Sequence, residues 1–196
     1  MIRAGHGDED GRSRAGGSVQ RCEGCPYGQA VAVGARGDPE SPTVLVGEAP
    51  GKREVEVGRP FVGPAGQLLG DVANEAGLRL DDVFIVNAVA CLPVPTTPRK
   101  SAILACRPRL LTELSRAPRL VIITLGATAT RSVLNDFGYR VVAGRGRPRV
   151  SPWGDVMPTV HPAFVRRRPS ARALLLRDLQ WAVHRGRPSQ GSGYGH

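Results

Sequence analysis

Four short, almost uninterrupted runs of apolar residues divide the chain. They occupy 43–46, 83–86, 120–124 and 156–160. Apolar runs of this length, without alternating polar positions, are typical of strands that are covered on both faces of a parallel sheet. The pattern therefore predicts four buried strands separated by long connections, because parallel strands cannot be joined by tight hairpins.

The connections between these runs carry helical patterns. Apolar residues recur there at spacings of three and four, which predicts helices that begin near Pro64, Pro108, Ala127 and Ser170. The alternating order predicts an α/β fold, a three-layer α/β/α sandwich with a central, mainly parallel four-stranded sheet. Residues 19–185 are expected to form one domain. The polar, glycine-rich ends, 1–18 and 186–196, are expected to be disordered.

The charge balance favours an anionic partner. The 196 residues include 27 Lys and Arg against 17 Asp and Glu, a formal net charge of +10. Nucleic acid fits such a balance better than a membrane surface. A compositional bias of the whole proteome explains the charge equally well, given the 25 Gly and 17 Pro. No run is apolar enough for a membrane span or a signal peptide, so we expect a location in the bacterial cytosol or nucleoid. We also expect a monomer.

The four cysteines have the spacing of a metal site. Cys22 and Cys25 form a Cys-x-x-Cys pair, while Cys91 and Cys106 flank a proline-rich loop. Four thiolates suit either tetrahedral zinc or a cubane iron–sulfur cluster. The wide second spacing differs from the two tight pairs of a zinc ribbon and favours iron–sulfur. Either group would act structurally, and its binding free energy would add to the free energy of folding.

Three polar residues follow the predicted strands. Glu48, Asn87 and His161 each stand at a strand's carboxyl end, which is where ligands bind in open α/β sheets. Glycine-rich turns surround Glu48 and lead into the helix at Pro64, and Phe61 in the second turn could stack on a base. Each residue also has an ordinary structural explanation, such as core packing for Phe61 or a turn contact for Asn87.

Taken together, these motifs resemble the family 4 uracil-DNA glycosylases. The resemblance is carried by GEAPG at 47–51, GRPFVGPAG at 58–66, Asn87 and the cysteines, and HPAFVR at 161–166, and it covers most of the chain. It implies an enzyme that flips uracil out of single- or double-stranded DNA and hydrolyses its N-glycosidic bond. It also implies a [4Fe-4S] cluster, with zinc as the alternative, on Cys22, Cys25, Cys91 and Cys106.

The same resemblance assigns roles to the site residues. Asn87 would pair with the Watson–Crick edge of uracil, and Phe61 would stack on the ring. Glu48 would position water or stabilise the sugar cation, and His161 would stabilise the leaving uracil anion. The remaining expected contacts are Gly47 and Ala49 with the substrate, and Arg166, Arg167 and Arg168 with DNA phosphates, extended by Arg145, Arg147 and Arg149.

The chain departs from the family pattern at Val55, Ala90 and Leu92, where acidic, Lys and Arg residues are usual. These changes motivate an alternative, a non-catalytic or covalently trapped binder of uracil-containing or single-stranded DNA. Trapping would need a histidine in an inserted loop, and none lies between Asn87 and Cys106. A nucleotide hydrolase is a weaker alternative. Neither lysine, Lys52 or Lys100, is expected beside the site, so a lyase step is not expected.

Overall fold

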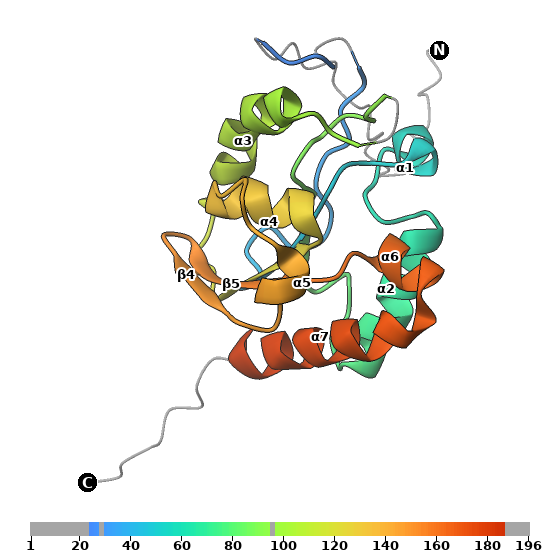
Figure 1. Cartoon of the computed structure of the whole chain (residues 1–196), viewed down its shortest axis with the longest axis vertical. Helices are drawn as coiled ribbons and strands as arrows, with labels where there is room; N and C mark the ends of the chain where they lie inside the picture. The colour runs from blue at the N-terminus through green and yellow to red at the C-terminus, as the bar shows by residue number, and fades with distance from the viewer. Residues whose placement is uncertain (1–23, 28–29, 95–96, 187–196) are drawn as a thin grey trace, which may run out of the picture.

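A five-stranded sheet forms the centre of the computed structural model (Figure 1). Residues 24–27, 30–94 and 97–186 are described; the ends predicted to be disordered lie outside these ranges, except for Gly186. In chain order the strands are β1 Thr43–Gly47, β2 Phe84–Asn87, β3 Val121–Leu125, β4 Arg149–Ser151 and β5 Gly154–Thr159. Their spatial order is β2-β1-β3-β5-β4, and all neighbours are parallel except β4 and β5.

The sheet therefore has one strand more than the four predicted. The additional strand, β4, pairs antiparallel with β5 at the edge of the sheet. It is three residues long, and its central residue, Val150, is 89% exposed. A search for buried apolar runs cannot find such a strand, because it has no covered face. The four strands that were expected are buried and parallel, which confirms the α/β sandwich.

Helices cover both faces of the sheet (Figure 1). Those with at least six residues are α1 Lys52–Val57, α2 Pro64–Glu75, α3 Lys100–Leu114, α4 Ala127–Leu134, α6 Pro162–Arg167 and α7 Arg172–Gly186. The shorter ones are α5 Val141–Gly144 and the 3-10 helix η1 Pro169–Ala171. Alternate strand residues serve the two faces: Leu45, Ile85 and Ile123 pack with α2 and α7, whereas Val44, Val86 and Ile122 pack with α3 and α4.

Helix α3 begins at Lys100, eight residues before the predicted start at Pro108, which lies inside the helix. The buried stripe explains the difference. It already starts at Ala102, Ile103 and Cys106 and continues through Leu110 and Leu114 at helical spacing. Burial of this stripe outweighs the backbone hydrogen bond that a proline removes.

The chain reverses direction across the sheet at β1. It runs from β1 to β2 on one side and then returns to β3 on the other, so β1 and β3 are neighbours whose connections lead apart. A crevice at the carboxyl ends of two such strands is the usual ligand site of open α/β sheets. In the described part of the chain, no helix is both long and apolar enough to cross a membrane.

Candidate active site

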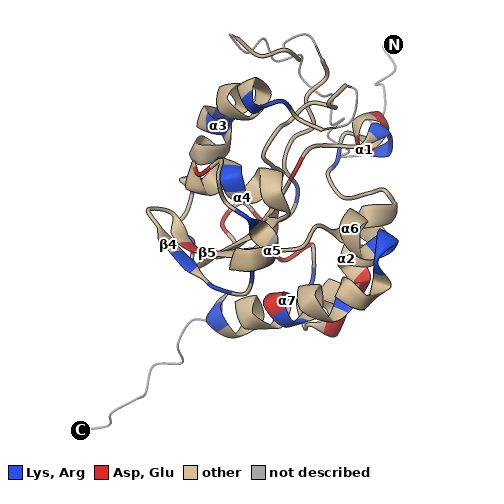
Figure 2. Cartoon of the chain, viewed as in Figure 1, with Lys and Arg blue, Asp and Glu red and all other residues tan. Residues whose placement is uncertain are grey.

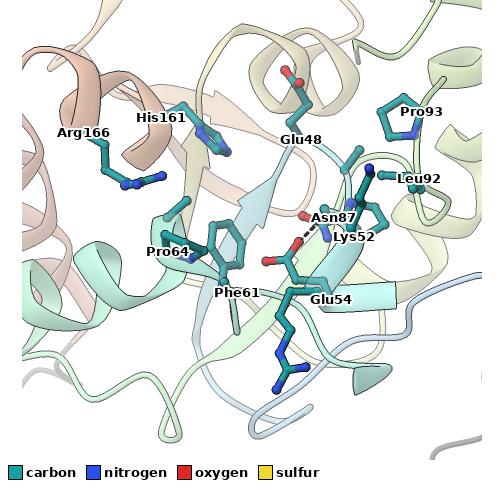
Figure 3. A pocket seen from close by; sticks show the side chains of 16 residues that line it. Glu48, Lys52, Glu54, Phe61, Pro64, Asn87, Leu92, Pro93, His161 and Arg166 are labelled. Carbon is teal, nitrogen blue, oxygen red and sulfur yellow. Dashed lines mark hydrogen bonds between the residues drawn. The ribbon is translucent and has the colours of Figure 1, made fainter. Parts of the chain in front are cut away.

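A pocket of about 410 Å³ opens at the carboxyl ends of the central strands. Its lining brings together Glu48 after β1, Asn87 at the end of β2, His161 after β5, and Phe61 from the loop before α2 (Figure 3). Arg166 lies near His161, while Leu92 and Pro93 form the opposite side. These residues come from distant parts of the chain, and the parallel strands bring them to one edge of the sheet.

Contacts from β1 and from α3 hold Asn87 in position. It is 4% exposed and lies opposite Gly47 in the β1–β2 register. A Cβ atom on Gly47 would overlap the Asn87 Oδ1 atom and lie 2.7 Å from the Phe61 ring, so only glycine fits there. Gly47, an expected substrate contact, does not itself line the pocket, whereas Ala49, two residues further on, does. Arg109 of α3 donates to the Asn87 carbonyl oxygen and holds the main chain in place.

Phe61 adopts a left-handed backbone conformation with φ 55° and is 6% exposed. Such a conformation is unfavourable for an aromatic residue and persists only where the surroundings enforce it. Gly66 of α2 is part of that enforcement, because a Cβ atom at this position would overlap the Phe61 carbonyl oxygen. The close approach of the helix to the loop therefore directs the ring into the pocket.

Glu54 is a site residue that sequence reasoning missed. It lines the pocket and accepts a 2.6 Å hydrogen bond from the Gly51 N–H. Burial raises its pKa, against the opposing effect of hydrogen bonds from the Gly51, Phe61 and Val62 amides. Glu54 thereby ties the start of α1 to the Phe61 loop. The glutamate three residues after Gly51 has the spacing of a capping box, which is the signal that could have revealed it.

His161 is held in one protonation state. Its Nδ1 atom accepts a 3.1 Å hydrogen bond from the Ala163 N–H, so the proton of the neutral ring lies on Nε2. Burial, followed by the positive charge of Arg167, lowers the His161 pKa to about 4. The ring is therefore neutral at pH 7 and carries one N–H donor. Its centroid lies 6.3 Å from that of Phe61.

Glu48 contacts a residue that no sequence motif singles out. Its Oε2 atom accepts a 2.6 Å hydrogen bond from Thr128 Oγ1, eighty positions along the chain in α4. In Figure 3 the Glu48 carboxylate points away from the Phe61 ring. The arrangement as a whole provides a carboxylate, an amide, an aromatic ring and a neutral imidazole donor around one space.

Comparison with known proteins is consistent with this geometry. Residues 35–182 match the family model "Uracil DNA glycosylase superfamily". The type-4 uracil-DNA glycosylase of Thermotoga maritima is 36% identical over 170 residues, covering 84% of this chain and 88% of the relative. That of Pyrobaculum aerophilum is 36% identical over 172 residues, covering 82% and 87%. The chain belongs to the type-4 family of the uracil-DNA glycosylase superfamily.

The cations around the pocket of this type-4 chain differ in part from those expected. Lys52 lines the pocket together with Arg53 and Arg166, so the expectation that no lysine lies beside the site is wrong. The error arises because α1, which begins at Lys52, returns over the pocket rather than leading away from it. Arg167 and Arg168 are exposed but do not line the pocket.

The other basic residues of the described part of the chain are spread over several helices and other segments (Figure 2). Figure 2 shows Lys and Arg on α3, α4, α6 and α7. Arg145, expected to extend a basic face, instead pairs at 3.5 Å with the buried carboxylate of Asp178. Arg149 lies over the ring of Tyr139, at 5.9 Å from its centroid. The cations that line the pocket therefore indicate a DNA contact more specifically than the net charge of the chain does.

Three of the four cysteines lie in one apolar cluster beside the pocket. Cys91 and Cys106 are buried there, and Cys25 packs against them, while Cys22 lies outside the described residues. A bridge between Ala32 and Cys91 joins the N-terminal segment to this cluster. Among the described residues, no group of three or more His, Cys, Asp or Glu is arranged to hold a metal.

Two of the three described sulfur atoms nevertheless accept main-chain hydrogen bonds, whereas the Cys91 thiol donates to the Ala30 carbonyl oxygen at 3.7 Å. The Ala90 N–H donates to Cys106 Sγ at 3.4 Å, and the Tyr27 N–H donates to Cys25 Sγ at 3.5 Å. Amide donors of this kind favour the charged thiolate and tune metal centres held by cysteine. The contacts of Cys25 and Cys106 therefore fit ligands of a thiolate-bound cluster or metal.

Two of the departures from the family pattern lie at these sites. Ala90 is buried in the cysteine cluster, and Leu92 lines the pocket. Val55 is partly buried in α1. Leu92 adds apolar surface to the pocket wall, so the wall opposite Arg166 carries less charge than the family pattern predicts.

Proposed function

We propose that the protein removes uracil from DNA by hydrolysing the N-glycosidic bond of a flipped-out nucleotide, as the first step of base-excision repair. The observation that carries the proposal is the convergence of Glu48, Phe61, Asn87 and His161 on one pocket of about 410 Å³. Membership of the type-4 family supports it, because the relatives are named as uracil-DNA glycosylases. The products are free uracil and an abasic site.

Recognition of the base uses Asn87 and Phe61. The Asn87 amide offers one acceptor and two donors, which match the donor and acceptor atoms on the Watson–Crick edge of uracil. The Phe61 ring supplies a flat apolar surface for the base, which repays part of the cost of unstacking it from the duplex. The crowding of Asn87, Phe61 and Gly47 keeps both groups in one arrangement.

Departure of the base uses His161. As the bond breaks, the electron pair stays on the uracil nitrogen and its charge spreads to the carbonyl oxygens. A neutral imidazole with its proton on Nε2 donates a hydrogen bond to such an oxygen without needing to transfer a proton. The main-chain contact from Ala163 to Nδ1 keeps that donor available.

Stabilisation of the sugar uses Glu48. Loss of the base leaves a positive charge on the sugar; water then adds to the same carbon and releases a proton to the solvent, and the uracil anion takes up a proton from the solvent to become free uracil. A carboxylate at the crevice between β1 and β3 stabilises that charge and orients the water. The negative charge of Glu48 and the neutral donor of His161 thus serve opposite charges of one transition state.

DNA is held by the cations of the pocket rim, Lys52, Arg53 and Arg166, with Arg167 and Arg168 beside them. Cys22, Cys25, Cys91 and Cys106 would hold a [4Fe-4S] cluster, or zinc as the alternative. When bound, this group would pin the N-terminal segment to the loop after β2 and stabilise the fold. All proposed reacting groups come from one copy of the chain, which suits a monomer. The DNA substrate and reduced thiols suit the cytosol or nucleoid.

The test is an excision assay. A labelled oligonucleotide that contains one uracil is incubated with the protein and then cleaved with alkali, which cuts only at abasic sites. We expect cleavage in single- and double-stranded substrates, and a panel of deaminated bases defines the base range. Glu48→Ala and His161→Ala should each lower the rate by about 10²-fold or more. Binding without cleavage would favour the non-catalytic binder, and full activity in both variants would remove the mechanism.

A further inference from the structure

The junction between β3 and α4 touches both residues that we assign to catalysis, although it supplies no reacting group. Gly126 at this junction has φ 90°, and a Cβ atom there would lie 3.1 Å from the His161 Cβ. The Gly126 N–H also donates to the Thr159 carbonyl oxygen at 2.9 Å, which ties the junction to the end of β5. The position of α4 relative to the pocket is therefore fixed by the main chain.

Thr128, two residues further on, reaches from α4 to Glu48. Its side-chain hydroxyl donates to Glu48 Oε2 at 2.6 Å, and Thr128 is 6% exposed. Among the described residues, this is the one hydrogen bond made by the Glu48 carboxylate. Thr128 does not line the pocket itself, and the lining residue that its hydroxyl contacts is Glu48.

The neighbouring threonine of α4 is a useful contrast, because its hydroxyl makes no contact with the residues assigned to catalysis. Thr130 is also buried in α4, but its hydroxyl bonds back to the Gly126 carbonyl oxygen at 2.9 Å and to Thr124 Oγ1 at 2.8 Å. Back-bonding of this kind is the usual solution for threonine in a helix. Thr128 instead donates outward to the carboxylate.

We propose that Thr128 is a positioning residue, which holds Glu48 in the one orientation that serves the sugar cation and its water. This inference rests on the proposed function. A glutamate has three rotatable bonds, and a free carboxylate at a pocket mouth would sample several rotamers. The β-branched threonine has a restricted χ1 angle and is mounted on a fixed helix. It occupies one Glu48 oxygen and leaves the other for the reaction.

The experiment compares Thr128→Val, which removes the hydroxyl but keeps the shape, with Thr128→Ser, which keeps the hydroxyl. Thr130→Val is the matched control, since it removes a buried hydroxyl from the same helix. We expect Thr128→Val to lower the single-turnover excision rate by roughly tenfold to a hundredfold, the range of a hydrogen bond to a charged group. Thr128→Ser and Thr130→Val should stay within about threefold of the parent protein.

Binding is measured on the same variants with DNA that contains a non-cleavable 2′-fluoro analogue of deoxyuridine. Thr128→Val should bind this DNA as the parent does, because the lost contact touches no part of the DNA. An equal loss of binding and rate would overturn the proposal. Thr128→Ala serves as a second hydroxyl-free variant if the valine variant is poorly folded.

A double-mutant cycle separates positioning from a general structural effect. In a Glu48→Ala background, Thr128→Val should cause no further loss, because the residue through which it acts is absent. Independent, multiplicative losses would overturn the inference. If Glu48→Ala excises uracil at the parent rate, the proposed mechanism fails. If Glu48→Ala is impaired while Thr128→Val is not, only the role of Thr128 fails.

Discussion

At the scale of single residues, His161 has the most sharply defined chemistry. Its folded pKa of about 4 lies well below the ordinary value of 6.5, chiefly because the ring is buried and secondly because Arg167 is near. Between these two pH values the unfolded chain binds more protons than the folded one. The contribution of His161 to the free energy of unfolding therefore falls as the pH drops from 6.5 towards 4.

We predict that the imidazole of His161 titrates near pH 4 in the folded protein, with the neutral ring protonated on Nε2. Nitrogen NMR of histidine-labelled protein measures both properties, and the single-turnover rate should show no inflection near pH 6.5 from this residue. A control variant is His184→Ala, which should leave the excision rate unchanged, because His184 is exposed and does not line the pocket. A His161 titration near pH 6.5 would contradict the prediction.

Lys52 is the subject of a second prediction about a single residue. Its side chain is exposed at the pocket, and no hydrogen bond or ion pair engages it among the described residues. We predict that Lys52→Ala weakens binding of DNA of any sequence and reduces the slope of log K against log salt by about 1, as loss of one phosphate contact should. A salt titration of binding measures this. An unchanged slope would show that Lys52 does not contact phosphate.

At the scale of elements, two glycines in α2 offer a matched comparison. A Cβ atom on Gly66 would overlap the Phe61 carbonyl oxygen, whereas one on Gly70 meets a single Leu80 methyl carbon at 3.7 Å. We predict that Gly66→Ala displaces Phe61 and lowers both the excision rate and the melting temperature. Gly70→Ala should raise the free energy of unfolding by up to about 1 kcal/mol, because alanine favours helix. Equal behaviour of the two variants would contradict the prediction.

Apolar periodicity predicts the inner strands and α4 closely, because those elements are covered by the core. It gives no sign of β4, whose side chains face solvent, or of the short helices α1 and α6, which carry too few buried residues for a period. It also places the start of α3 too late, since a proline within the helix resembles a boundary. Element type thus follows from burial, while edges and short helices depend on tertiary contacts.

The site residues also divide into those that the sequence predicts and those that only tertiary contacts place. Glu48, Asn87 and His161 are predictable because each follows a strand, and parallel strands end at one edge. Thr128 is not, because the side chain that it contacts lies eighty positions away and its own sequence context is an ordinary helix start. Lys52 is misjudged for a related reason: the return of α1 over the pocket is set by the turn at Gly51 and its contact with Glu54.

At the scale of the whole molecule, the cysteine cluster joins the N-terminal segment to the loop after β2. We predict that protein purified without oxygen is brown and contains the iron and labile sulfide of one [4Fe-4S] cluster per chain. Substitution of any one of the four cysteines by alanine should lower the folded yield more than it lowers the rate per folded molecule. Elemental analysis and visible absorption measure the content. Colourless protein with stoichiometric zinc would contradict the iron–sulfur assignment.

The contact that sets the His161 tautomer comes from the main chain at Ala163. Every amino acid except proline supplies the same amide, so almost any substitution at that position leaves the imidazole donor as it is. The position of the His161 proton therefore does not depend on which side chain evolution places at position 163. Variation at the exposed arginines of α6, Arg166 and Arg167, can therefore alter the contact with nucleic acid while the His161 donor is preserved.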